Sequence, residues 1–222
     1  RGGGPAGVVG RRPRCLKDVT NDDPGGHHLS GDLLAAWTTG LAWAEHRSWA
    51  MAGHWSTAAT IDGVTATLAP ISAHHGRRAD QLRTFWPQRR GGTDGAASPA
   101  GPPTPDDGPL LDLANALDEA QRSLGPPGET TWTGTTSMAA LRLTAQLILP
   151  RFLTCYKQLL KLANAPSDAS IRRICELALT DTTADFVTAT AKLAALGENP
   201  GPSQIDDIQH AGMGQNPTHR PK

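Results

Sequence analysis

Residues 135–163 read TTSMAALRLTAQLILPRFLTCYKQLLKLA. Apolar or aromatic side chains recur every three or four residues through this stretch, which is the spacing of one helix face. They are Leu141, Ala145, Ile148, Phe152, Tyr156, Leu159 and Ala163. The pattern predicts a long amphipathic helix. Pro150 lies inside it, and because proline has no backbone N–H, we expect a kink there.

Further segments on either side carry the same spacing and predict helices over residues 31–56, 64–86, 109–124 and 167–196. Polar residues that can cap a helix stand at two of the starts: Ser30 or Asp32 for the first, Ser167 or Asp168 for the last. Gly197 follows the last segment and is a typical helix terminator. Pro70 lies within 64–86 and predicts a kink or a helix start there.

The order of these segments predicts the fold class. No stretch alternates with period two for long enough to predict a strand, so we expect an all-α chain. Two helices, a linker over residues 88–108, a short helix and two more helices predict a four-helix bundle with one long crossover and one extra short helix. The expected core residues are Leu34, Trp37, Leu41, Ala52, Leu68, Ile71, Leu82, Phe85, Leu141, Ile148, Phe152, Leu159, Ile174, Ala178 and Ala189.

Composition narrows the function classes. The chain has 222 residues, with 21 basic and 21 acidic side chains. A net charge of zero argues against a general nucleic-acid binder and against attraction to a membrane surface. Residues 1–29 and 198–222 are rich in Gly, Pro and polar residues and predict disordered tails around a bundle of residues 30–197. Residues 1–29 lack the apolar core of a secretory signal, so we expect a cytoplasmic protein.

Each long helix carries one polar residue in the middle of its apolar stripe. These residues are Glu45, His75, Tyr156 and Asp185, and Arg78 lies on the same line as His75. A polar group buried in a bundle needs a partner, so the four side chains could meet in one cluster.

Two interpretations of this cluster stay open. In the first it is a metal or substrate site, with Glu45, His75 and Asp185 as ligands of iron or manganese and with Tyr156 and Arg78 beside them. In the second it is a buried polar network without a ligand, in which Glu45 pairs with Arg78 and Asp185 with Tyr156. Among the other histidines, His54 is expected to point away from its stripe and His74 to lie at a flank.

Two parts of the chain resemble ferritin-like bundle proteins of high-GC bacteria. The first comprises LLAAWTTGLAWAEHRSWAMAGHW, residues 33–55, and HHGRRADQLRTFWP, residues 74–87; the second is residues 132–186. The resemblance implies a ferritin-like four-helix bundle. Carboxylate proteins of that class bind two metal ions through Glu residues and Glu-x-x-His motifs.

This chain departs from that pattern. None of its glutamates is followed three residues later by a histidine, and only Glu45 and Asp185 are well placed as carboxylate ligands. Arg78 would neutralise Glu45 and repel a cation. We therefore expect an inactive ferritin-like bundle in which Arg78 stands where a cation would otherwise sit. The alternative is a di-iron or di-manganese oxidoreductase.

Residues 74–82, HHGRRADQL, are similar to a His-His-Arg-Gly-Gln stretch of DinB-like proteins. That resemblance implies a thiol transferase that holds one metal ion with three histidines. In this chain the ligands would be His75 with His46 or His54, and the third histidine ligand is missing.

A non-enzymatic alternative is a binding or scaffold module. Trp37, Trp43, Trp49 and Trp55 are six residues apart and spread around the first helix. We expect Trp37 and Trp55 to be buried. Trp43 should face outward, where the short helix, a second subunit of a homo-oligomer or a flap of the linker could cover it.

Overall fold

The computed structural model describes residues 31–85, 108–125, 132–163 and 166–197. Its helices are α1 (Gly31–Ala58), α2 (Asp62–Arg83), α3 (Pro109–Leu124), α4 (Gly134–Arg142), α5 (Leu149–Leu162) and α6 (Ala169–Ala195). These ranges contain no strand, which confirms the all-α prediction for the described residues. The tails expected at residues 1–29 and 198–222 lie outside these ranges, as does the expected linker apart from Gly108.

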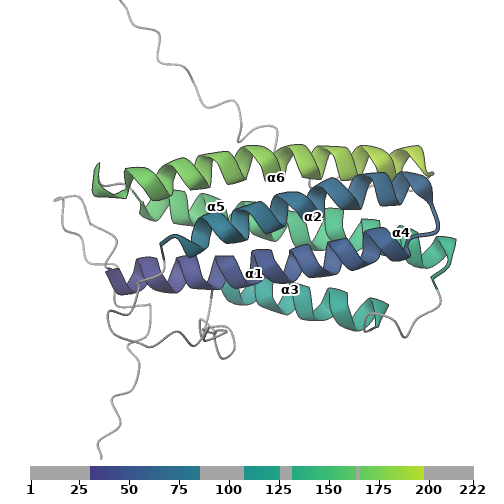
Figure 1. Cartoon of the computed structure of the whole chain (residues 1–222), viewed down its shortest axis with the longest axis horizontal. Helices are drawn as coiled ribbons and strands as arrows, with labels where there is room; N and C mark the ends of the chain where they lie inside the picture. Colours follow the sequence, from purple (N-terminus) through teal and green to yellow (C-terminus); the bar gives the residue numbers. More distant parts are fainter. Residues whose placement is uncertain (1–30, 86–107, 126–131, 164–165, 198–222) are drawn as a thin grey trace, which may run out of the picture.

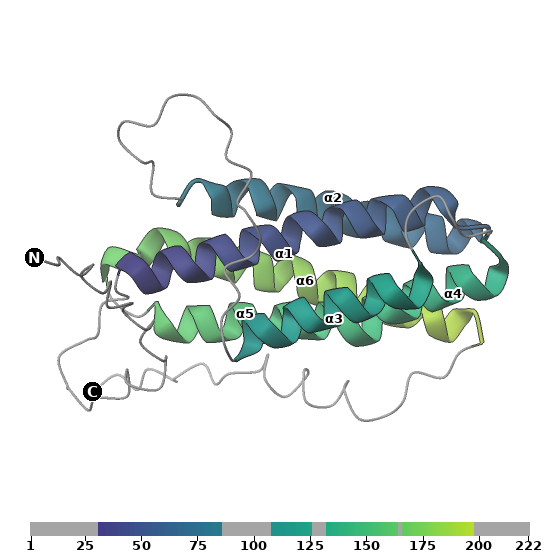
Figure 2. The same ribbon diagram turned by 90° about the horizontal axis from the view of Figure 1, so that it is seen from below.

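The helices lie side by side and form an elongated bundle (Figure 1). The chain turns at residues 59–61, so that α1 and α2 form an antiparallel pair. Helix α6 packs against α2 and α5, and α3 packs against α1 and α5 (Figure 2). Helices α3 and α6 therefore lie on opposite sides of the bundle, and the polar residues predicted for the core come from α1, α2, α5 and α6.

Most predicted boundaries are close to the observed ones. The short helix spans Pro109–Leu124 as predicted, and Gly197 follows α6 with a positive φ of 86°. Helix α2 begins at Asp62 and continues through Pro70, so the alternative of a helix start at Pro70 is wrong. Asp168 takes the cap position of α6, although its side chain makes no capping hydrogen bond there.

The long helix predicted over residues 135–163 is interrupted by a π-helical stretch, Leu143–Ile148. Its last turn is closed by the Leu149 N–H, which donates to the Thr144 carbonyl five residues back. The reason is Pro150, which has no N–H to donate and whose ring would collide with the carbonyl four residues earlier. A wider turn avoids that collision. The chain therefore stays helical on both sides of Pro150.

The core follows the predicted stripes. All predicted core residues are buried except Leu34, Phe85 and Ile174, which are partly buried and pack against the core. Trp37 and Trp55 are buried as expected. Trp43 is partly buried against the core, and the Arg47 guanidinium lies over its ring at 5.2 Å. No described helix has both the length and the hydrophobicity that crossing a bilayer requires.

Candidate functional site

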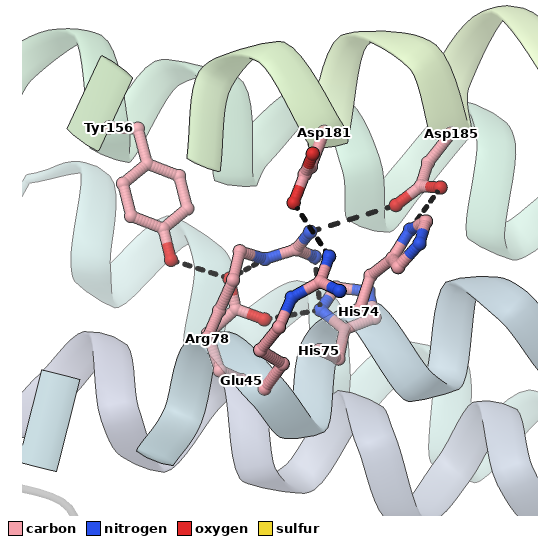
Figure 3. Close-up of polar contacts among 8 residues, drawn as sticks. Glu45, His74, His75, Arg78, Tyr156, Asp181 and Asp185 are labelled. Atoms are coloured by element: carbon pink, nitrogen blue, oxygen red, sulfur yellow. Dashed lines mark hydrogen bonds and ion pairs between the residues drawn. The ribbon is translucent and has the colours of Figure 1, made fainter. Parts of the chain in front are cut away.

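The antiparallel pairing of α1 and α2 places Glu45 beside two residues of α2. The Ser72 hydroxyl of α2 donates to the Trp49 carbonyl of α1 at 2.9 Å, which fixes the relative height of the two helices. At this height Glu45 faces His75 and Arg78 in the interior (Figure 3). Tyr156 from α5 and Asp185 from α6 approach the same region from the other side.

Glu45 is fully buried and accepts hydrogen bonds on both carboxylate oxygens. Its Oε1 accepts from Arg78 Nε at 2.9 Å and from the Tyr156 hydroxyl at 2.6 Å. Its Oε2 lies 2.5 Å from His75 Nδ1. A carboxylate buried without partners would be costly, and here donors from α2 and α5 surround it.

The pKa shifts of Glu45 and Arg78 both favour the charged forms of these two side chains. Burial alone raises the pKa of Glu45, but Arg78, His75 and the Tyr156 hydroxyl outweigh burial and lower that pKa below 4.5. For Arg78, burial lowers the pKa, and the attraction of Glu45 outweighs it, so the net shift is upward. Glu45 and Arg78 therefore form a buried ion pair at neutral pH.

His75 is held in its neutral form. Burial lowers its pKa below 6.5 and outweighs the opposing attraction of Glu45. His75 Nδ1 lies close to both Glu45 Oε2 and Arg78 Nη2, the latter at 3.0 Å. An ionised carboxylate only accepts hydrogen bonds, so we assign the proton of the neutral ring to Nδ1, as donor to Glu45. In that tautomer the Arg78 contact is a close approach and not a hydrogen bond. The ring also packs against apolar surface, since its centroid is 4.9 Å from that of Phe152.

Tyr156 is also held in its neutral form. Burial and the neighbouring Glu45 charge raise the pKa of its hydroxyl well above 10. The hydroxyl therefore acts as a hydrogen-bond donor to Glu45 over the whole physiological range.

Asp185 extends the cluster towards the surface. Its Oδ1 lies 2.8 Å from His74 Nδ1, and its Oδ2 is 3.7 Å from Arg78 Nη1. Asp185 is buried, whereas the side chain of His74 is 31% exposed. Oδ2 of Asp185 and Nη1 of Arg78 are both buried and make no hydrogen bond with any described residue. The six residues Glu45, His74, His75, Arg78, Tyr156 and Asp185 are called the core network below.

A further ion pair between α2 and α6 lies outside the core network. Arg77 Nη2 donates to Asp181 Oδ2 at 2.9 Å, and the Arg77 side chain is 54% exposed. Arg77 precedes Arg78 by one residue, and Asp181 precedes Asp185 by one helical turn. The Arg77–Asp181 pair therefore links α2 to α6 near the solvent, as Arg78 and Asp185 do in the interior.

The structure brings together the residues singled out from the sequence, but it forms only one of the two expected pairs. Glu45 pairs with Arg78, as one interpretation proposed. The expected pair of Asp185 with Tyr156 is wrong, because Tyr156 donates to Glu45 and Asp185 contacts His74 and Arg78. His74 is the member of the core network that sequence reasoning did not include. The sequence predicted that His74 lies at the flank of the apolar stripe of its helix. The packing of α6 against α2 decides that this flank faces Asp185.

These residues do not fit a di-metal centre of the ferritin-like kind. No group of three or more His, Cys, Asp or Glu side chains among the described residues is arranged to hold a metal ion. Both Glu45 oxygens already accept hydrogen bonds, and the Arg78 guanidinium contacts Glu45 and Asp185. Of the three expected ligands, Glu45 and His75 contact each other, and the Arg78 guanidinium lies between Glu45 and Asp185.

The remaining described histidines do not complete a three-histidine site. The His46 ring packs on Trp49 at 5.0 Å, and the His54 ring faces Trp132 at 6.2 Å. His46 is exposed on α1. Neither side chain contacts His75 in the described residues, so the arrangement implied by the DinB-like resemblance is not formed.

In comparisons with protein-family models, curated proteins and solved structures, nothing matched this chain. The interpretation of the site therefore depends on its own geometry.

Proposed function

We propose that the chain is a ferritin-like bundle in which the core network takes the place of a metal centre, and that it serves as a binding or scaffold module. The observation that carries the proposal is the position of Arg78, with Nε 2.9 Å from Glu45 and Nη1 3.7 Å from Asp185. A guanidinium stays protonated in proteins, so it fills the place of a cation between the two carboxylates.

Charge supports the same conclusion. With His75 neutral, two carboxylates face one guanidinium, which leaves little negative charge to hold a divalent ion. A metal ion would also have to displace donors from Glu45, and each displaced donor would lose its partner in the interior.

A surface hollow favours a binding role. It lies between α1 and α3, has a volume of about 780 Å³ and shares no residue with the core network. This volume is within the usual range of ligand pockets, roughly 300–1,000 Å³. Arg47, Asp118, Glu119 and Arg122 line it. Arg47 is already paired with Asp118 at 2.6 Å, so Glu119 and Arg122 are the charged lining residues that face a ligand without that pair.

Metal analysis of the purified full chain tests the proposal. Protein produced with iron and manganese in the medium and purified without chelator is expected to contain far less than one equivalent of either metal. About one equivalent or more, lost in both Glu45→Ala and His75→Ala, would overturn the proposal in favour of a metal-dependent enzyme. Glu119→Ala and His46→Ala are the matched controls, because both residues are exposed and lie outside the core network.

A further inference from the structure

The outer face of α6 differs from the other exposed surfaces of the bundle. Its residues Leu177, Thr180, Ala184, Val187, Ala191 and Ala194 are all exposed, and none is charged. We call this set the α6 outer face. The remaining exposed residues between Leu177 and Leu196 are Thr188 and Ala195, which are also uncharged. Helix α6 forms one edge of the bundle in Figure 1, with no other described helix over this face.

Exposed large apolar side chains gather on α6. Among the described residues they are Leu177 (44% exposed) and Val187 (58%) on α6, Leu196 (37%) at its C-cap, and Trp49 on α1. The exposed residues of α2 and α5 include charged ones, such as Asp80 on α2 and Lys157 on α5. An uncharged apolar face on a single helix is typical of a surface that another protein covers.

The spacing of the α6 outer face suggests which protein covers it. Its members are separated by three, four, three, four and three residues, so the spacing is the same in either direction along the helix. Such alternation is the seam of a helix pair. If a second α6 lies antiparallel across this seam, Leu177 faces Ala194, Thr180 faces Ala191 and Val187 faces Ala184. Each larger side chain thereby meets an alanine, which allows close packing.

We propose that two copies of this chain pair through the α6 outer face, antiparallel, about a twofold axis between Ala184 and Val187. A twofold axis requires a self-complementary patch, and the sizes along this face meet that requirement. The proposal goes beyond the proposed function, because it concerns a surface remote in sequence from Glu45 and Arg78 and holds whether or not the core network binds metal.

Charge at the ends of the seam favours the antiparallel direction. Arg173 and Glu176 are both exposed within the turn before Leu177. A parallel pair would place the two copies of Arg173 next to each other, and likewise the two copies of Glu176. The antiparallel pair keeps these like charges at opposite ends of the seam.

The size of the face sets the expected affinity. The stretch from Leu177 to Leu196 is about 30 Å long at the rise of an α-helix. One helix face of this length is smaller than the roughly 800 Å² per partner of a standard interface. We therefore expect a reversible dimer with a dissociation constant of about 1–100 μM.

Sedimentation velocity of the full chain over a range of concentrations tests the proposal. The wild type is expected to shift from monomer to dimer, and Ala184→Glu to raise the dissociation constant at least about tenfold by placing a carboxylate in the seam. Ala69→Glu is the matched control, because Ala69 is an exposed alanine within α2. It should dimerise like the wild type, and circular dichroism should show that both variants remain helical.

A charge-pair rescue tests the register. Leu177→Lys and Ala194→Glu should each weaken self-association, whereas their equimolar mixture should form a heterodimer, because the new ammonium group of one copy then faces the new carboxylate of the other. A wild type that stays monomeric up to several hundred micromolar, well above the expected constant, would overturn the proposal. So would a dimer that Ala184→Glu leaves unchanged, or a mixture that associates no better than its components.

Discussion

Arg78 donates its Nε–H to Glu45 Oε1 at 2.9 Å, and both side chains are almost completely buried. A buried ion pair adds little stability compared with apolar residues of the same shape, because desolvation of both charges offsets their attraction. Removal of one partner is different, since it leaves the other charge buried alone. The pair therefore acts as a constraint: α1 and α2 must pack at the height where the two groups meet.

We predict that Arg78→Met lowers the free energy of unfolding by about 3–5 kcal/mol, because Glu45 then loses its counter-charge in the interior. Urea denaturation followed by circular dichroism measures the change. Arg77→Met is the matched control: it removes an exposed guanidinium one residue away, and the loss should be about 1 kcal/mol or less. Equal losses in the two variants would contradict the burial of the Arg78–Glu45 pair.

Tyr156 provides a spectroscopic test, because it is the single tyrosine of the chain. Burial and the Glu45 charge raise its pKa well above 10. We therefore predict that the ultraviolet absorbance of the phenolate does not appear near pH 10 in the folded protein, and that it appears when alkali unfolds the chain. Titration in urea supplies the reference. Ionisation near pH 10 while the circular dichroism is still native would show that the hydroxyl is not buried against Glu45.

Tyr156→Phe removes one donor from Glu45 and leaves Arg78 in place. The expected loss in the free energy of unfolding is about 1–2 kcal/mol, smaller than for Arg78→Met, because the carboxylate keeps its counter-charge. Urea denaturation of both variants under the same conditions tests this order of effects. The reverse order would show that the hydroxyl, rather than the guanidinium, keeps Glu45 stable in the interior.

The core network predicts how stability depends on pH. The pKa of His75 is lowered from 6.5 in the folded protein, so below pH 6.5 the unfolded chain binds a proton that the folded chain does not. The free energy of unfolding should therefore be highest above pH 6.5 and fall as the pH decreases, by at most about 1.4 kcal/mol per pH unit for this one group. Below pH 4.5 Glu45 should steepen the fall, because its pKa is also lowered.

Urea denaturation at a series of pH values measures this slope. His75→Gln should reduce the slope between pH 6.5 and 4.5, whichever way it changes the stability itself. Wild-type protein denatured under the same conditions is the reference. A slope that His75→Gln does not alter would contradict a neutral, buried His75.

Cys155 and Cys175 should be unreactive in the folded protein. Burial is the main cause that raises the pKa of each thiol to about 12, and the thiolate is the reactive form. Alkylation at mildly alkaline pH, followed by mass spectrometry of the peptides that contain them, should be at least about a hundredfold slower than in urea. Alkylation of either residue as fast as in urea would contradict its place in the core.

Local sequence determined the helices and their buried faces, because helix formation and amphipathic burial depend on residues a few positions apart. The apolar stripes identified the core, and the same periodicity placed Glu45, His75, Tyr156 and Asp185 in the interior. Pro150 marked the irregular point of the long helix. The wider π turn that the chain adopts depends on how the hydrogen bonds are redistributed around it.

Only the tertiary structure decided which of these polar groups meet. Periodicity gives the direction of a side chain around its helix, but not the height at which neighbouring helices pack or the side chain's reach. That height brings the Tyr156 hydroxyl to Glu45 instead of Asp185, and it turns the partly exposed His74 towards Asp185. The height is set by contacts between residues far apart in the chain, such as Ser72 with the Trp49 carbonyl, which no local pattern shows.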